Sequence, residues 1–379
     1  MELDVLRQRI DTINDEMVKL FVERMQIAND IASYKAQNGL PVLDKERERK
    51  ILSAMAQKAG EPFEDYTRLF FKNIFALSRA YQCSLLKHDN ALAERIQQAV
   101  GETEQTFPTS AVVACQGVEG AYSQMACEKL FAYPDIMYFQ GFEGVFQAVE
   151  SGLCRYGILP LENSSYGSVG AVYDLMKKHR FSIVRGIRLR ISHTLLAKHG
   201  TKLSNIREVF SHEQALGQCS EFLKQHPEIK VTVCANTAMA AKLVAASGRD
   251  DVAAISSKHC AELYGLTVLS ENIQNSDNNY TRFICISRKL EIYPGASKIS
   301  LMMAVPHRTG SLSELLSRFS MMGINLTKLE SRPIPGKDFE FMFYFDLEAS
   351  VLVPTVINLL CELQNGPDTF VFLGNYLEV

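Results

Sequence analysis

The apolar periodicity of the amino-terminal segment constrains the fold of this chain more than any other feature. Apolar residues recur there at alternating steps of three and four: Leu3, Leu6, Ile10, Ile13, Met17 and Leu20. Helix-compatible sequence continues to the breaker NGLP at 38–41, which predicts one helix about 50 Å long at 1.5 Å per residue. A helix of this length cannot bury its apolar stripe by itself.

Two further helices are predicted within residues 1–88. One starts in LDKERERKIL, where Asp44 is the expected N-cap, and the other runs roughly from Tyr66 to Leu86. Three helices give this all-α region only a thin core. We therefore expect an obligatory, intertwined homodimer, or a higher homo-oligomer, in which two chains complete the core together.

Polar residues of these helices recur at spacings that place several of them on shared faces. Arg24 and Lys35 are eleven residues apart, so they lie about 20° apart around the helix axis. Arg7 lies about 100° from Arg24 and could reach a pocket of the partner chain. The other polar residues at helical spacing are Asp44, Arg47 and Glu48, and Ser78 and Gln82. Solvated surface charge explains any one of them alone, but together they offer cations, carboxylates and neutral donors.

The segments LRQRID, ERMQIANDIASYK, VLDKERERKIL and LSRAYQ resemble the all-helical chorismate mutase family. The resemblance implies that three arginines hold the two carboxylates of chorismate: Arg7 from the partner chain, Arg24 and Arg47. It places Lys35 and Gln82 beside the breaking ether oxygen. It completes the polar lining with Asp44, Ser78 and Glu48, the last towards the ring hydroxyl. A pericyclic rearrangement needs a held reactive conformer and fixed donors to the ether oxygen, and we expect Lys35 to make the larger electrostatic contribution.

Strand and helix signals alternate beyond a short helical piece and a polar linker at 87–110. The expected strands include VVACQ, IMYFQ, YGILP, EVFSH, KVTVCA, VAAIS and LTVLS. This alternation is typical of α/β folds, and we assign residues 108–290 to a two-lobed α/β domain. In 296–379 the signals follow the order βαββαβ, the plan of an α+β, ferredoxin-like domain.

Four loops of the α/β region carry small or polar residues after a strand: GVEGAYS, LENSSYGSVG, SHEQALGQC and NSDNNYTRF. Ligands of open α/β sheets bind at the carboxyl ends of strands, so the four loops could converge on one cleft. Each also has an ordinary explanation. Gly117 and Gly120 suit turns, Ser211 suits a helix cap, and Glu162 suits an exposed position.

Together, GVEGAYSQ, LPLENSSYGSV, FSHEQALGQC and NYTRF resemble the prephenate dehydratase family, with Thr-Arg-Phe at 281–283 as its signature. The resemblance implies that Thr281 donates a hydrogen bond to the departing hydroxyl of prephenate, and that Arg282 pairs with a carboxylate or holds the loop. Glu162 is an alternative proton source if burial raises its pKa. The candidate substrate contacts are Ser123, Asn163, Ser164 and Ser211. Phe283 is expected to anchor its strand in the core, and RGIRLRISH and LSENIQNSD are expected to cross between the lobes.

The carboxyl-terminal segment HRTGSLSELLSRF places Gly310 and Ser311 at a helix start, where backbone N–H groups commonly receive carboxylates. The following element GINLTKLESRPIPG resembles the ACT regulatory domain of phenylalanine-controlled enzymes through its ESRP motif. The resemblance implies phenylalanine binding between paired domains, with feedback inhibition of the dehydratase. The implied effector-binding residues are Gly310, Ser311, Leu312, Asn325, Leu326, Glu330, Ser331, Arg332 and Pro333.

Composition restricts the class of ligand. The formal net charge is -3 and no block of like charges occurs, so we expect neither nucleic acid nor a membrane surface as partner. The nine cysteines are scattered, without a pair at metal spacing, and they suit small core residues in a reducing compartment. We expect a cytoplasmic protein that uses no metal and no other cofactor.

The three resemblances occur in the order expected of the bifunctional chorismate mutase/prephenate dehydratase family. They imply an isomerase and a carbon-oxygen lyase of phenylalanine biosynthesis. Two alternatives stay open: a dehydratase that prefers arogenate, and a non-catalytic amino-acid sensor with a two-lobed binding module.

Overall fold

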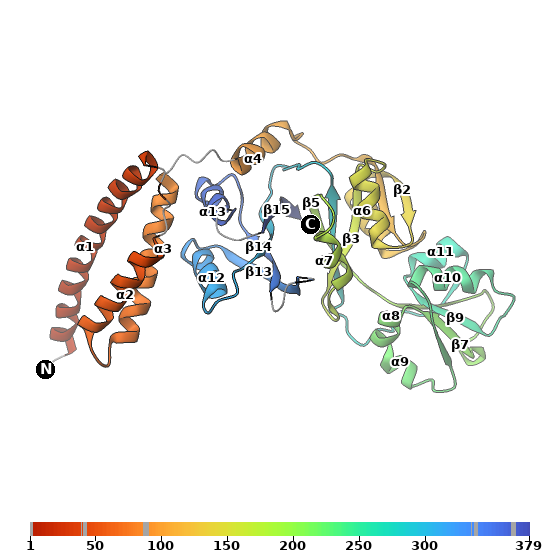
Figure 1. Ribbon diagram of the computed structural model, residues 1–379. Helices are drawn as coiled ribbons and strands as arrows, with labels where there is room; N and C mark the ends of the chain where they lie inside the picture. Colours follow the sequence, from red (N-terminus) through yellow and green to blue (C-terminus); the bar gives the residue numbers. More distant parts are fainter. Residues whose placement is uncertain are drawn as a thin grey trace. The chain divides into compact units, whose positions relative to one another are not determined.

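The computed structural model describes residues 3–38, 40, 44–85, 91–334, 336, 340–364 and 369–379. The chain divides into two compact units. The helical unit comprises residues up to 94 together with 352–366, and the mixed unit comprises 95–351 together with 367–379. Figure 1 shows the elements of both units coloured along the chain.

The helical unit contains three helices from the amino-terminal region and one from near the carboxyl terminus: α1 (Leu3–Gln37), α2 (Lys45–Ala59), α3 (Glu64–Leu85) and α13 (Pro354–Gln364). α1 is the single long helix that the periodicity predicts. Asp44 caps α2 as predicted, because its Oδ1 accepts a hydrogen bond from the Arg47 backbone N at 2.9 Å. α1 and α2 each pack against α3, and the predicted all-helical fold of this region is confirmed.

The apolar face of α1 is left largely uncovered within one chain. We call the six residues Leu3, Leu6, Ile10, Ile13, Met17 and Leu20 the α1 stripe. All six are exposed, Ile10 to 57% and Leu20 to 66% of their surface. Among the side chains of α1, α2 and α3 that the structure describes, the buried apolar ones are few and mostly small: Ala28, Ala32, Ala56 and Phe75. In a single chain, the apolar residues that a helix of this pattern normally buries are therefore exposed to solvent.

A ten-stranded mixed sheet runs through the mixed unit. Its order is β13 (Asn325–Pro333), β14 (Phe341–Glu348), β12 (Lys298–Ala304), β15 (Phe370–Glu378), β5 (Ser182–Arg190), β11 (Tyr280–Ser287), β3 (Tyr156–Asn163), β1 (Ser110–Gln116) and β2 (Tyr133–Phe139), with β4 (Gly167–Ser168) paired to β3. β1 pairs parallel with β2 and β3, whereas β11 pairs antiparallel with β3 and β5. The helices along this part are α4 (Ala91–Glu102), α5 (Tyr122–Leu130), α6 (Phe142–Ser151) and α7 (Gly170–Met176). The predicted α/β character is confirmed.

A separate five-stranded sheet forms the second lobe. Its order is β10 (Thr267–Ser270), β6 (Thr194–Ala197), β9 (Val252–Ser256), β7 (Glu208–Ser211) and β8 (Lys230–Val233). Its helices are α8 (Glu213–Gln218), α9 (Ser220–Lys224), α10 (Thr237–Ala246), α11 (His259–Tyr264) and the 3-10 turn Leu203–Asn205. The chain passes between the two sheets at 191–193 and at 271–279, as predicted. Phe283 is 2% exposed, which confirms its role as a core anchor.

The carboxyl-terminal elements follow the predicted order, β12, α12 (Ser311–Met321), β13, β14, α13 and β15. Their strands do not form a separate sheet, because β15 pairs parallel with β5 through Leu377 and Glu378. This pairing needs a close backbone approach at Gly374, which has a φ of 154°. A Cβ at that position would lie 2.2 Å from the Ile183 carbonyl oxygen, so only glycine fits there.

The cysteines behave as the sequence predicts. All those with a described side chain are free thiols, and all of these except Cys234 are buried. Buried thiols of this kind act as small apolar core residues.

Candidate active sites

Polar side chains of α1 and α3 meet in the interior of the helical unit. Arg24 Nη1 donates a hydrogen bond to Ser78 Oγ, and the Arg24 guanidinium lies 5.5 Å from the centre of the Phe75 ring. Ser78 is 5% exposed. Burial lowers the pKa of Arg24, and the Glu48 carboxylate acts in the opposite direction. The structure thus brings together two of the residues that the sequence singles out.

A second contact joins α2 to α3 through Glu48, whose carboxylate forms an ion pair with Arg79. Sequence reasoning did not single out Arg79, although it lies beside Ser78 in the motif LSRAYQ. Glu48 thus faces a protein cation in this structure. Gln82 lies one helical turn after Ser78, is 8% exposed, and its Oε1 has no hydrogen-bond partner among the described residues.

Arg7, another predicted mutase residue, lies far along α1 from this cluster. Arg7 pairs with Asp4 at 3.3 Å, and its side chain is 66% exposed. It precedes Arg24 by seventeen positions on α1, a separation of about 25 Å along the helix axis. It therefore cannot join the Arg24 cluster of its own chain. Arg47 is exposed in the first turn of α2, and Lys35 is partly buried in the last turn of α1.

In the mixed unit, two pairs of predicted residues lie on opposite faces of the same strand pair. β11 and β3 place Thr281 opposite Asn163, and Arg282 opposite Glu162. Successive residues of a strand point to opposite faces. The hydroxyl of Thr281 and the guanidinium of Arg282 are therefore directed away from each other.

Thr281 belongs to a cluster of side-chain amides. Asn163 Nδ2 donates to Thr281 Oγ1 at 2.9 Å and to Asn279 Oδ1 at 2.8 Å. Asn163 Oδ1 accepts from the backbone N–H groups of Ser165 and Tyr166 at 2.9 and 3.1 Å. These N–H groups can only donate, so they fix the orientation of the Asn163 amide. Thr281 Oγ1 then accepts from Asn163, and its own proton is left for another acceptor.

Asn279 and Gln218 extend this cluster into a cavity of about 140 Å³ that draws its lining from both lobes. Asn279 Nδ2 donates to Gln218 Oε1 at 3.0 Å. The cavity is lined by Ser165, Tyr166, Gly217, Gln218, Gln274, Asn275, Ser276 and Asn279. The sequence predicted that these loops could converge on one cleft, but it did not identify Gln218 or Asn279 as members of the site. The signal that could have identified them is their side-chain amides. Asn279 belongs to the asparagine-rich segment NSDNNY that precedes Thr281, and Gln218 belongs to the loop SHEQALGQC.

Two predicted substrate contacts, Ser211 and Ser164, form hydrogen bonds with the backbone, and a third, Ser123, is buried. Ser211 is completely buried, and its Oγ donates to the Ile255 carbonyl at 2.7 Å. Ser164 Oγ donates to the Asn278 carbonyl at 2.8 Å and accepts from Tyr280 N at 2.9 Å. Ser123 is buried in the first turn of α5. Ser211 and Ser164 thus hold neighbouring backbone segments in this structure.

The opposite face of β11 holds a buried ionic cluster around Arg282, which is 4% exposed. Its Nη2 lies 2.5 Å from Asp346 Oδ2, its Nη1 lies 3.4 Å from Glu378 Oε2, and its Nε lies 2.8 Å from Glu162 Oε1. Burial acts to lower the pKa of Arg282, but the surrounding acids, Asp346 first, outweigh it and raise the pKa. Of the two predicted roles for Arg282, the structure supports the one that holds protein segments together.

Glu162 does not meet the condition under which it could supply a proton. Burial acts to raise its pKa, but Arg282 and Lys328 outweigh burial and hold the pKa of Glu162 below its ordinary value. Lys328 Nζ lies 2.7 Å from Glu162 Oε2. Glu162 is thus a carboxylate at neutral pH in this structure.

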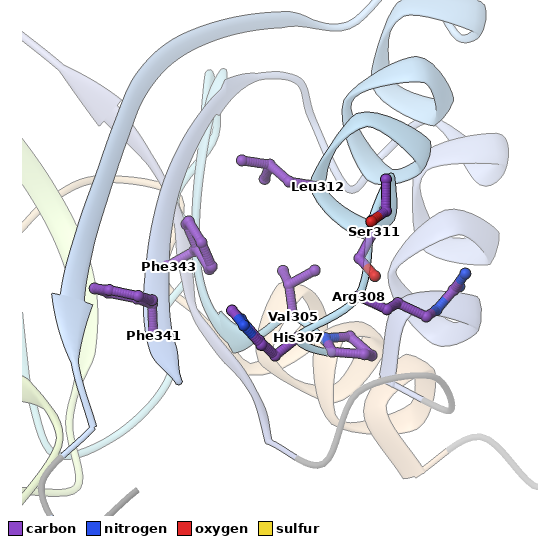
Figure 2. Close-up of a pocket in the computed structure, with 9 residues that line it drawn as sticks. Val305, His307, Arg308, Ser311, Leu312, Phe341 and Phe343 are labelled. Atoms are coloured by element: carbon purple, nitrogen blue, oxygen red, sulfur yellow. The ribbon is translucent and has the colours of Figure 1, made fainter. Parts of the chain in front are cut away.

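A larger cavity of about 470 Å³ lies where β12 leads into α12 (Figure 2). It is lined by Val305, Pro306, His307, Arg308, Thr309, Ser311, Leu312, Phe341 and Phe343. Gly310 precedes α12 with a φ of 87°, a conformation that favours glycine. Ser311 is 8% exposed, and its Oγ has no partner in the described part of the chain. Of the predicted effector residues, Ser311 and Leu312 line this cavity and Gly310 adjoins it.

The ESRP residues of β13 point elsewhere. Arg332 forms a bidentate ion pair with Asp174 of α7, at 2.7 and 3.2 Å, and Glu330 Oε2 accepts a hydrogen bond from Ser168 Oγ at 2.7 Å. The Pro333 carbonyl accepts from Lys177 Nζ at 3.0 Å. Glu330 and Arg332 were expected to bind the effector. They are two residues apart on β13, so their side chains lie on the same face of the strand, and both contact the α/β region.

The other predicted effector residues of β13 also lie outside the cavity lining. Asn325 Nδ2 donates to Glu348 Oε2 at 2.7 Å, Leu326 is partly buried, and Ser331 is exposed. Across the residues that the structure describes, no group of three His, Cys, Asp or Glu side chains could hold a metal ion. In the same ranges, the helices are either too short or too polar to cross a membrane.

Two family models match this chain, and they fall on the two regions that carry these sites. Chorismate mutase type II matches residues 6–83, and prephenate dehydratase matches residues 113–291. The chain thus combines two enzyme domains. A curated bifunctional chorismate mutase/prephenate dehydratase from Enterobacter agglomerans is 34% identical over 382 residues, which cover 98% of this chain and 95% of the relative. The chain belongs to the bifunctional chorismate mutase/prephenate dehydratase family.

Two solved structures share the fold of the mixed unit. A prephenate dehydratase from Arthrobacter aurescens, in complex with L-Phe, aligns with a TM-score of 0.65 and 27% identity, over 70% of this chain and 89% of its own. GqqA, described as a novel type of quorum quenching acylase, aligns with a TM-score of 0.64 and 29% identity, over 71% of this chain and 98% of its own.

Proposed function

We propose that this chain converts chorismate to prephenate in the helical unit, and prephenate to phenylpyruvate in the mixed unit, as an enzyme of phenylalanine biosynthesis. Membership of the bifunctional family supports both reactions. The single structural observation that carries the dehydratase assignment is the Thr281 hydroxyl, which accepts from Asn163 and keeps its own proton available. The proposed division of the chain is 1–88, 108–290 and 296–379.

For the mutase reaction, Arg24, Arg47 and the partner chain's Arg7 bind the two carboxylates of chorismate. Lys35 and Gln82 donate to the ether oxygen as its bond to the ring breaks, and Asp44, Glu48 and Ser78 complete the lining. The reaction only reorganises bonds within the substrate, so the site has to hold the compact conformer and stabilise charge on the ether oxygen. The Arg24 hydrogen bond to buried Ser78 supports a fixed position for one of these cations.

For the dehydratase reaction, the ring carboxylate leaves as carbon dioxide, and its bonding electrons enter the ring as the ring C–O bond breaks. Thr281 donates a hydrogen bond to the departing oxygen, which takes up a proton from the solvent and leaves as water. Asn163 donates both of its amide hydrogens within the cluster, to Thr281 and Asn279, whereas Asn279 gives one to Gln218 and keeps one for the substrate. Aromatisation drives the reaction, so the protein chiefly has to assist the leaving group.

We further propose that two chains intertwine through α1. The α1 stripe is exposed in one chain, and burying such a stripe is strongly favourable at about 25 cal/mol per Å². The position of Arg7, about 25 Å along α1 from Arg24, also supports a site that takes one arginine from the partner. A chain that sediments as a stable monomer at micromolar concentration would contradict this dimer.

We propose that residues 296–379 form an ACT regulatory domain that binds phenylalanine and inhibits the dehydratase. The cavity at Gly310, Ser311 and Leu312 supports an amino-acid site beside a helix N-terminus. The prephenate dehydratase of Arthrobacter aurescens was solved with L-Phe. The contacts of Glu330 and Arg332 with Ser168 and Asp174 support a physical link from this domain to the α/β region.

One experiment tests both activities and their regulation together. Purified chain is assayed by ultraviolet absorbance for loss of chorismate and for formation of phenylpyruvate, with and without millimolar phenylalanine. We expect both reactions without added metal or coenzyme, and inhibition of the second by phenylalanine. A parallel assay with arogenate tests the arogenate-preferring alternative. If the chain turns over neither chorismate nor prephenate nor arogenate, the non-catalytic sensor is favoured.

A further inference from the structure

His193 is a buried histidine at the crossing between the two lobes, between β5 and β6. It is 2% exposed, and its ring lies edge-on to Tyr122 with 6.3 Å between ring centres. Its backbone N donates to Gln274 Oε1 at 2.9 Å, and its carbonyl accepts from Ile273 N at 3.0 Å. Its ring Nε2 lies 2.6 Å from Gln218 Oε1. This last contact joins His193 to the amides around Thr281.

The direction of every hydrogen bond from Thr281 to His193 follows from two backbone groups. Ser165 and Tyr166 donate their N–H groups to Asn163 Oδ1, so Asn163 must donate through Nδ2 to both Thr281 Oγ1 and Asn279 Oδ1. With its Oδ1 accepting, Asn279 donates through Nδ2.

The same reasoning reaches the histidine ring. Asn279 Nδ2 donates to Gln218 Oε1 at 3.0 Å, so the atom of Gln218 that faces His193 is an acceptor. His193 Nε2 therefore has to carry a proton and donate it to Gln218. His193 Nδ1 is buried and has no hydrogen-bond partner within the described ranges of the chain.

A second proton on this ring would place a charge in a buried site. Burial lowers the pKa of His193, while the hydrogen bond to Gln218 acts in the opposite direction. His193 is therefore neutral at physiological pH, in the tautomer with its proton on Nε2. This tautomer matches the direction of the amide chain.

We propose that His193 is a positioning residue of the dehydratase reaction, which holds Gln218 and, through it, Asn279 in place beside Thr281. It anchors the end of the amide chain opposite to Asn163, which the backbone N–H groups of Ser165 and Tyr166 hold. This inference rests on the role proposed for Thr281. Without the Nε2 donor, Gln218 Oε1 keeps only the hydrogen bond from Asn279 Nδ2. The Gln218 side chain and its partner Asn279 are then held less firmly, while the backbone N–H groups of Ser165 and Tyr166 still hold Asn163. Loss of alignment in such a chain affects the reacting group more than the binding of the substrate.

Two polar substitutions separate this role from simple core packing. His193→Gln carries an amide nitrogen close to the position of the ring Nε2, whereas the shorter His193→Asn carries one near Nδ1 and cannot reach Gln218. We expect dehydratase kcat to fall about tenfold to 100-fold in His193→Asn, with KM changed less than about twofold. His193→Gln should recover most of this loss. The mutase activity of the same chain should be unchanged in both variants and serves as the control for the amount of active chain in each sample.

Equal kcat values for His193→Gln and His193→Asn, or wild-type kcat in His193→Asn, would overturn the positioning role. If His193→Asn also lowers thermal stability, a rise in KM equal to the fall in kcat would mark a structural role and equally overturn it. Thr281→Val, assayed beside them, separates the two proposals. Full dehydratase activity of Thr281→Val would contradict the role proposed for Thr281. If Thr281→Val is inactive while both His193 variants keep wild-type kcat, only the role proposed for His193 is contradicted.

Discussion

Arg282 Nη2 lies 2.5 Å from Asp346 Oδ2, so the arginine of the Thr-Arg-Phe signature is paired with an acid of the carboxyl-terminal strands. Arg282 belongs to β11 and Asp346 to β14, two strands of one ten-stranded sheet. Ser300 Oγ also donates to Asp346, at 2.5 Å. The signature therefore serves two purposes on the two faces of β11, since Thr281 faces the amide cluster and Arg282 holds the sheet together.

Replacing Arg282 should destabilise the mixed unit. Arg282→Met leaves Glu162, Asp346 and Glu378 without their shared cation in a site that is nearly closed to solvent. Removing one partner of a buried ion pair costs about 3–5 kcal/mol. Chemical denaturation of the full chain measures this loss. Arg190→Ala is a matched control on the neighbouring strand, because Arg190 is 54% exposed, and it should change stability by less than about 0.5 kcal/mol. Equal stability of the two variants would contradict the ionic cluster.

Lys35 should be required for the mutase reaction alone. In the proposed site, Lys35→Ala removes the cation that stabilises charge on the ether oxygen, so the mutase kcat should fall roughly 100-fold. Dehydratase kcat, measured on the same sample, should stay within about twofold. Lys50→Ala provides a surface control, because Lys50 is 69% exposed on α2. A mutase rate near wild type in Lys35→Ala would remove the electrostatic assignment.

The contact between β13 and α7 should couple phenylalanine binding to the dehydratase. Asp174→Asn weakens the bidentate pair with Arg332 and should reduce the maximal inhibition by phenylalanine. The Kd of phenylalanine, measured by calorimetry, should change less than about threefold, because Asp174 makes no contact within the pocket. The substitution should instead reduce the coupling free energy between phenylalanine binding and the dehydratase, which is typically about 1–3 kcal/mol. Asp250→Asn, at an 86% exposed position, should leave inhibition intact. Unchanged inhibition in Asp174→Asn would show that regulation takes another route.

Acid should destabilise the second lobe through Glu208. Hydrogen bonds from Thr232 at 2.7 Å and Arg249 at 2.6 Å, together with Lys230, lower the pKa of Glu208 to about 2. In the unfolded chain a glutamate titrates near about pH 4.3. Because the folded pKa is depressed, this group contributes stability that is complete above about pH 4.3 and is lost as the pH falls towards about 2.

Glu208→Gln should therefore be less stable than wild type at neutral pH and should lose less stability on acidification. Thermal melts of both chains between about pH 6 and pH 3 measure the difference. Glu221→Gln, at an exposed position of α9, is the control and should follow the wild-type curve. Parallel curves for Glu208→Gln and wild type would exclude this contribution.

The sequence predicted the elements of this fold because their signals are local. The α1 periodicity, the Asp44 cap and the alternation of strands and helices each depend on neighbours a few residues apart. The continuous sheet was not predictable in this way. It depends on the pairing of Leu377 with Arg185, two residues that are distant in the chain, and on the close approach at Gly374.

The sites show the same division. Thr281, Asn163 and Arg24 lie in motifs whose chemistry the sequence displays, and the structure places each in a polar cluster. Which face of a strand each neighbour occupies was not readable from the sequence. The choice between the two roles of Arg282 therefore stayed open, and Glu330 and Arg332, which were expected to bind the effector, pair with protein groups in this structure. The role of Gln218 as partner of Asn279 and the tautomer of His193 follow from the directions of hydrogen bonds, and these depend on the three-dimensional structure.

The rate of prephenate turnover by Thr281→Val tests the central claim most directly. Valine nearly preserves the shape of threonine and removes only the hydroxyl, which accepts from Asn163 and which we propose to donate to the leaving group. We expect dehydratase kcat to fall at least 100-fold, with mutase kcat unchanged as the internal control. A Thr281→Val chain that forms phenylpyruvate at the wild-type rate would contradict the account.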